Sequence, residues 1–204
     1  MPQSHGRIAP HDLLFYDKFM KSFDIQAGSA RHLRLCAVVR AGALLGVAMS
    51  LALPAIFWTD AARVADLAPQ IAGLPCGAAA VIDETARAWA VAISVVPIAL
   101  AIAFFATVWR LFGEYRAGRA LTLPAQRLLQ RLAWLLLAIV LSQPLVRAAM
   151  SVALTMHNPA GKRHLVIGLG SNDYLGLIVA LTLLAIATVM RQAVGAAEEN
   201  RGFV

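Results

Sequence analysis

Charged residues are scarce in this sequence. They make up 14% of its 204 residues, whereas hydrophobic residues make up 60% and the mean hydropathy is +0.70. An average soluble domain carries about 25% charged and about 45–50% apolar residues. A soluble fold of this size would be left with an apolar exterior. The composition therefore excludes an ordinary soluble domain and predicts a protein embedded in a lipid bilayer.

Cysteines and catalytic motifs are also lacking. The only cysteines are Cys36 and Cys76, and the sequence has no CxxC pair or Cys/His cluster. A structural zinc site is therefore not expected. The motifs HExxH and GxSxG and the phosphate-binding P-loop are absent too. We expect neither an enzyme nor a bound cofactor or metal.

Four apolar stretches are long enough to cross a bilayer, which requires about 20 helical residues. They cover residues 37–58, 89–111, 132–156 and 174–193. A backbone in hydrocarbon must satisfy its own hydrogen bonds, which favours helices. The predicted fold is an all-α integral membrane protein. It consists of a four-helix transmembrane bundle (37–193) between an N-terminal segment (1–36) and a short tail (194–204).

The basic residues are distributed unevenly about this predicted bundle. Thirteen Lys and Arg residues fall on the side of the two termini and four on the other side, leaving out Arg147, which lies within a span. An excess of basic residues marks the cytoplasmic side. We therefore expect both termini in the cytoplasm and a multi-pass protein of the bacterial inner membrane. This bias accounts for most of the net charge of +7 without direct nucleic-acid binding.

Residues 12–25 have an amphipathic pattern. Tyr16, Phe19, Met20 and Phe23 recur at helical spacing, with charged residues between them. The pattern predicts a helix lying in the cytoplasmic interface of the membrane. A loosely packed terminus is the alternative.

Small residues recur every fourth position in the first span, at Gly42, Gly46 and Ser50. Such a face lets two helix backbones approach closely. The pattern does not name its partner, so it indicates either packing inside the protein or the seam of a homo-oligomer.

Arg147 is the one charge placed well inside a predicted span, and Ser142 and Gln143 make its surroundings the most polar part of any span. Charges at membrane depth are costly and often functional. Because Arg147 lies toward the outer end, its long side chain could instead extend to the interface. The residues therefore form either a polar ligand or gating site or a structural feature.

Two prolines, Pro97 and Pro144, lie inside spans two and three, toward their outer halves. Each removes a backbone donor and kinks its helix. Paired kinks would open an outward-facing cavity. The alternative is the ordinary tolerance of membrane helices for proline.

Three segments resemble a known family. The first, residues 111–122 between the middle spans, has an aliphatic-aromatic pair followed by Tyr, Gly, a hydrophobic residue and Thr. The second, residues 165–173, leads into span four. The third, residues 193–204, contains two glutamates followed by Asn and ends in Phe-Val. In these segments the chain is similar to the bacterial membrane proteins catalogued as domain of unknown function 2975. The resemblance implies four helices with cytoplasmic ends. Members are often encoded beside a small helix-turn-helix regulator, which implies a cytosolic protein partner.

The turn between spans two and three is predicted to be a short rigid elbow. Gly118 suits a left-handed turn, and Thr122 is placed to cap a new helix with Pro124 in its first turn.

The elbow and the tail offer charges of both signs for docking a partner: Arg116 and Arg119 in the elbow, and Glu198 and Glu199 in the tail. Contact with lipid headgroups is the alternative role for these charges. The function favoured is a regulatory or interaction protein that docks a cytosolic partner such as a helix-turn-helix regulator. The second hypothesis is a small transporter or channel component with a polar site in span three, and a membrane enzyme is the third.

Overall fold

The structure is a computed structural model that describes residues 30–74, 82–159 and 161–201. Within these ranges the chain forms five helices and no strand, so the predicted all-α fold is confirmed. The helices are α2 (Ala30–Thr59), α3 (Ala61–Ile71), α4 (Glu84–Arg116), α5 (Leu123–Thr155) and α6 (Ser171–Arg201). The amphipathic helix predicted at 12–25 lies outside the described residues.

Four of the helices, α2, α4, α5 and α6, are long enough and apolar enough to cross a membrane. Each predicted span falls on one of them, and each helix is longer than its predicted span. The ends are longer because polar residues flanking an apolar run continue a helix as readily as apolar ones. The chain is thus a multi-pass membrane protein with four spanning helices.

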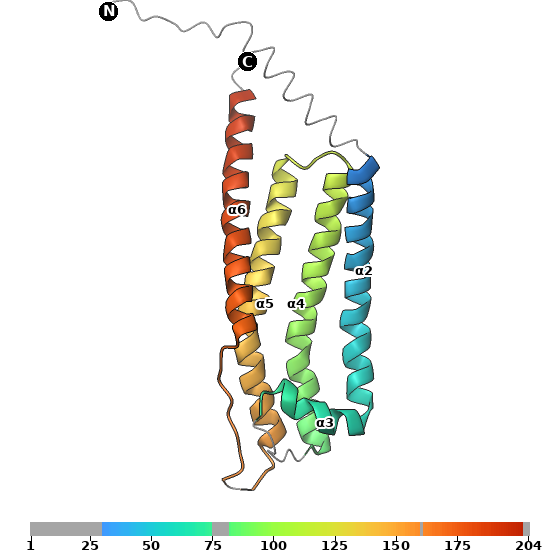
Figure 1. The fold of residues 1–204 in the computed structure, drawn as a ribbon, viewed down its shortest axis with the longest axis vertical. Helices are drawn as coiled ribbons and strands as arrows, with labels where there is room; N and C mark the ends of the chain where they lie inside the picture. The colour runs from blue at the N-terminus through green and yellow to red at the C-terminus, as the bar shows by residue number, and fades with distance from the viewer. Residues whose placement is uncertain (1–29, 75–81, 160, 202–204) are drawn as a thin grey trace, which may run out of the picture.

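The bundle is arranged as an open row (Figure 1). The four long helices lie side by side in the order α2, α4, α5, α6, and the extensive packing joins only neighbours in that order. No comparable contact joins α2 to α6 among the described residues. Large apolar side chains are exposed along every spanning helix, among them Leu45, Val95, Leu145 and Val189. In a bilayer these side chains face lipid rather than water.

The described chain starts and ends on one side of the row, which we call the terminal side (Figure 1). The opposite end is the distal end, where α3 lies across the row. The main cluster of buried apolar residues is at the distal end: Val64 and Ala72 from α3 and the turn after it, Ala90 from α4, and Met150 and Leu154 from α5. By packing on this cluster, α3 closes the distal end of the row.

Close approach of α2 to α4 depends on Gly46. A β-carbon added at Gly46 would lie 2.6 Å from the ring of Phe105 on α4. One further turn along α2, Ser50 Oγ donates to the Gly46 carbonyl at 2.7 Å. Gly42 is exposed and has nothing within 4 Å of an added β-carbon. The small-residue face therefore packs inside the protein at Gly46 and is open at Gly42.

The elbow between α4 and α5 has the predicted geometry in most respects. Gly118 has a φ of +74°, and Thr122 occupies the N-cap position of α5 with Pro124 in the first turn. The Thr122 hydroxyl, however, donates back to the Arg119 carbonyl at 2.8 Å and does not cap the helix. Gln126, almost fully buried, donates to the Ala120 carbonyl at 2.9 Å, which holds the turn against α5.

Candidate functional site

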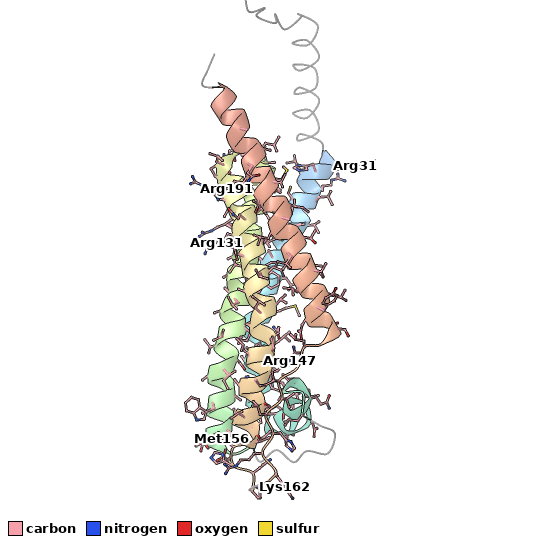
Figure 2. All side chains as sticks on the ribbon, turned by 90° about the vertical axis from the view of Figure 1, so that its left-hand side faces the viewer. Arg31, Arg131, Arg147, Met156, Lys162 and Arg191 are labelled. Atoms are coloured by element: carbon pink, nitrogen blue, oxygen red, sulfur yellow. The ribbon has the colours of Figure 1, made fainter. Side chains whose placement is uncertain are left out.

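The side chain of Arg147 is paired with a carboxylate. Its guanidinium donates to the carboxylate of Asp173, which lies in the first turn of α6. The same carboxylate oxygen accepts the backbone N–H of Gly170 at 2.7 Å. Asp173 is 9% exposed, whereas the Arg147 side chain is 29% exposed. The pair therefore joins α5 to the start of α6 (Figure 2).

The acidic partner of Arg147 was not predicted from the sequence. A usable signal was present, because Asp173 is the acidic residue that borders span four and Arg147 is the charge inside span three. Fifteen uncharged residues separate Arg131 from Arg147, and seventeen separate Asp173 from Arg191. Both stretches are shorter than the about 20 residues that cross the hydrocarbon. Both charges are consequently expected at a similar depth, just inside the edge of the membrane. An ion pair between them lowers the free-energy cost of placing either charge there.

Ser142 and Gln143 do not join this pair. Ser142 Oγ donates to the Ile139 carbonyl of its own helix at 2.7 Å. Gln143 is partly exposed one turn before Arg147, and the described residues show no hydrogen-bond partner for it. The structure thus replaces the predicted Arg147–Gln143–Ser142 grouping with an Arg147–Asp173 tie.

The segment leading into α6, residues 164–170, runs back alongside α5, and we call it the strap. Val166 N–H donates to Ser151 Oγ at 3.0 Å, and His164 N–H donates to Thr155 Oγ1 at 3.2 Å. Leu165, Ile167 and Leu169 in the strap are exposed. An irregular backbone near hydrocarbon needs hydrogen-bond partners from protein, and the two buried hydroxyls supply them. The strap is therefore attached to α5 by hydrogen bonds rather than free of the bundle.

This attachment gives a testable prediction. Ser151→Ala removes the acceptor of the Val166 N–H and should lower the free energy of unfolding by about 1 kcal/mol. The matched control is Ser142→Ala, because that hydroxyl bonds only within its own helix, and its effect should stay within about 0.5 kcal/mol. Thermal unfolding in detergent measures both variants. Equal effects would show that the strap does not depend on Ser151.

The prolines line cavities at the distal half of the row. Pro97 of α4 faces a cavity of about 490 Å³ together with Pro54 of α2, a proline that sequence analysis did not single out. Pro144 lines a different cavity of about 580 Å³ between α5 and α6, which also borders Asp173. The hypothesis of one cavity shared by Pro97 and Pro144 is therefore wrong, because Pro97 lies where α4 meets α2 whereas Pro144 lies where α5 meets α6.

A polar cluster ties the distal ends of the helices together. Asp83 caps α4 by accepting the Ala86 N–H at 2.8 Å, and it also accepts the Thr85 hydroxyl and faces His157 Nδ1 at 3.1 Å. These contacts, the Ala86 N–H above all, hold the pKa of Asp83 below its usual value. Arg87 donates to the Trp58 carbonyl at the end of α2. The cluster is structural, since its polar groups bond to one another and to helix ends.

The predicted docking charges differ in their availability. Arg119 binds Glu114 through Nε at 2.7 Å, a hydrogen bond that raises the pKa of Arg119. Arg116 is exposed and makes no ion pair within the described residues. Glu198 and Glu199 belong to α6, but their side chains lie outside the described part of the chain. Arg116 is thus the cation of the elbow that is open to a partner.

The residues that the structure describes contain no group of three or more His, Cys, Asp or Glu side chains that could hold a metal ion. The buried Cys36 on α2 contacts the ring of His32 one turn earlier, with a distance of 3.9 Å between Sγ and Nε2.

Comparisons with known proteins place the chain in a family. No curated protein and no solved structure matches it. The family described as "Protein of unknown function (DUF2975)" matches residues 61–201, from α3 to the end of α6. This match confirms the resemblance seen in the sequence and covers well over half of the chain. The protein therefore belongs to the DUF2975 family.

Proposed function

We propose that the protein is a non-enzymatic membrane anchor that docks a cytosolic protein, such as a helix-turn-helix regulator, on its terminal side. In this proposal the terminal side faces the cytoplasm of a bacterial cell and the distal end faces outward. The basic residues support that orientation, because Arg116, Arg119, Arg127 and Arg131 all lie toward the terminal side and cytoplasmic loops are enriched in such residues.

The observation that carries the proposal is the projecting end of α6. Arg191 donates to Gln130 of α5 at 2.6 Å, which fixes the register of the two helices. Beyond that contact α6 continues to Arg201, and Figure 1 shows its end extending past the ends of α2, α4 and α5. A helix end that stands clear of the row offers a partner both a surface and charge.

The charges near this helix end favour a protein partner. Glu198 and Glu199 give α6 an acidic end, while Arg116 gives the neighbouring elbow an unpaired cation. Charges of both signs at fixed positions steer association and select among partners. The Arg119–Glu114 ion pair contributes by holding the elbow in one conformation.

The polar pair inside the membrane is better explained as a structural tie than as a transport site. The charge of Arg147 is balanced by Asp173, and the same carboxylate is bonded to the Gly170 N–H. A solute would have to displace an ion pair that holds two helices together. The geometry therefore favours docking over the transporter hypothesis.

Charge reversal tests the docking proposal. Arg116→Glu should reduce the cytosolic protein crosslinked to the full-length chain in native membranes at least tenfold, because like charges across an interface are unfavourable and each loss of about 1.4 kcal/mol lowers the affinity tenfold. Lys162→Glu is the matched control, since Lys162 is an exposed cation at the distal end (Figure 2). Mass spectrometry of the crosslinked proteins measures recovery. Equal recovery from Arg116→Glu and the unchanged protein would refute docking at the elbow.

A further inference from the structure

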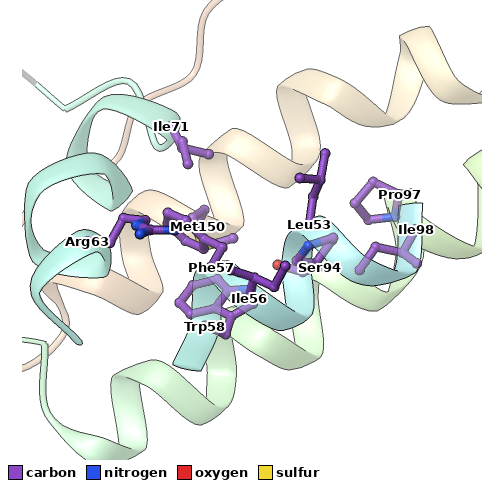
Figure 3. Close-up of a pocket in the computed structure, with 11 residues that line it drawn as sticks. Leu53, Ile56, Phe57, Trp58, Arg63, Ile71, Ser94, Pro97, Ile98 and Met150 are labelled. Atoms are coloured by element: carbon purple, nitrogen blue, oxygen red, sulfur yellow. The ribbon is translucent and has the colours of Figure 1, made fainter. Parts of the chain in front are cut away.

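The cavity beside Pro54 and Pro97 has different lining residues at its two ends. Leu53, Pro97 and Ile98 lie at one end, toward the middle of the spans, and Arg63 and Ile71 of α3 lie at the other (Figure 3). Its volume of about 490 Å³ falls within the about 300–1,000 Å³ of typical small-molecule pockets. The cavity therefore has an apolar end within the membrane and a cation at its distal rim.

The cavity exists because the line of contact between α2 and α4, which we call the α2–α4 seam, opens toward the distal end. The seam is closed at Gly46, which contacts Phe105. Two turns further along α2, Pro54 lines the cavity, and so does Pro97 on the facing helix. A second, smaller cavity of about 200 Å³ lies on the seam and shares Pro54 and Ser94 with the first. The two helices thus leave room beside the prolines that no side chain of the described chain fills.

The walls favour hydrocarbon over water. The hydroxyl of Ser94 already donates to the Ala90 carbonyl at 2.8 Å. The rest of the deep wall is aliphatic, proline or aromatic, including Phe57 and Trp58. A buried water needs two to four polar partners, which this wall does not provide. An acyl chain meets no such requirement.

Arg63 leaves donors unused at the rim. Its Nε faces Asp60 Oδ2 at 3.4 Å, and both side chains are about half exposed, 53% and 42%. An exposed pair of this kind is weak. The two terminal nitrogens of Arg63 have no partner within the described residues. Together they form the planar fork that binds a phosphate through two hydrogen bonds.

We propose that this cavity binds an anionic phospholipid, with one acyl chain between Pro54 and Pro97 and the headgroup phosphate on Arg63. The polarity of the site matches the polarity of the lipid, since the cation lies on α3 at the distal end of the row and the apolar end lies toward the middle of the spans. The bound chain would fill the open part of the α2–α4 seam. This inference does not depend on the docking proposal, because the two sites lie at opposite ends of the row.

Native mass spectrometry of the full-length protein, delipidated in a non-ionic detergent, tests the proposal. Phosphatidylglycerol should be retained several-fold better than phosphatidylcholine with the same acyl chains, because both lipids carry the phosphate but the choline cation of phosphatidylcholine repels the Arg63 guanidinium and offsets the phosphate charge. Arg63→Gln should reduce phosphatidylglycerol retention to the phosphatidylcholine level, while Lys162→Gln, a distal cation away from the cavity, should leave the preference unchanged. Ser94→Leu, which fills the cavity, should lower retention of both lipids.

Four results would overturn the proposal. One is equal retention of the two lipids by the unchanged protein, and another is an undiminished preference in Arg63→Gln. The third is full retention in Ser94→Leu, which would place the acyl chain elsewhere. If Ser94→Leu does not fold, Ile98→Phe fills the same cavity and the same readout applies. Dimerisation on delipidation, with no rebinding of lipid, would identify a second copy as the occupant and would also refute it.

Discussion

Replacing Asp173 with alanine should lower the amount of folded protein extracted from membranes several-fold. The substitution leaves the charge of Arg147 without its partner at membrane depth, where an unpaired charge is costly. It also removes the acceptor of the Gly170 N–H at the start of α6. Loss of the tie should separate the distal part of α6 from α5. Size-exclusion chromatography of the detergent extract, with fluorescence detection, measures the folded fraction.

A double variant distinguishes the effect of an unpaired Arg147 charge from the effect of losing the Asp173 side chain. Arg147→Leu combined with Asp173→Asn removes both charges while asparagine can still accept the Gly170 N–H, so most of the yield should return. Asp66→Asn on exposed α3 is the control for loss of a carboxylate and should have no effect. If Asp173→Ala alone gave normal yield, Arg147 would not need its partner, and extension to the interface would be the better explanation.

Gly46→Leu should lower the free energy of unfolding by about 1–3 kcal/mol, the usual cost of overfilling a packed interface. An added β-carbon would already lie 2.6 Å from the Phe105 ring, and a leucine extends further. Either the ring or the whole of α2 must move. Thermal unfolding in detergent should show a clear decrease in the midpoint.

Gly42→Leu is the matched control on the same helix. Nothing lies within 4 Å of a β-carbon at Gly42, so this variant should be as stable as the unchanged protein or slightly more so, since leucine favours helix over glycine. The pair also tests the homo-oligomer alternative for the small-residue face. A change of oligomeric state in Gly42→Leu would identify a seam there, and equal destabilisation by both variants would contradict the packing described for Gly46.

The sequence was sufficient to predict the four spanning helices, because each depends only on a local run of apolar residues. The elbow was predictable for a similar reason, since Gly118, Thr122 and Pro124 carry local turn signals. Even there, the Thr122 hydroxyl bonds to Arg119 rather than to the helix, a choice between two nearby partners that the sequence does not reveal.

Features that depend on which helices are neighbours were not predicted. Arg147 and Asp173 are 26 residues apart, and their contact requires α6 to begin beside the distal part of α5. One hypothesis placed Pro97 and Pro144 on a common cavity, but the row brings Pro54 to Pro97. The attachment of the strap was not predicted either, because it depends on Ser151 and Thr155 in another element. Apolar composition does not distinguish a closed bundle from an open row, since lipid covers either surface.

The open row also bears on how the protein is assembled. Each spanning helix packs mainly on the one synthesised immediately before it, first α4 on α2, then α5 on α4, then α6 on α5. A nascent chain leaving the translocon could therefore form each seam as soon as the next hairpin is inserted, without waiting for the C-terminus. Contacts between sequence neighbours favour rapid folding. In such a scheme the Arg147–Asp173 tie forms last, and until α6 is inserted Arg147 remains near the membrane surface.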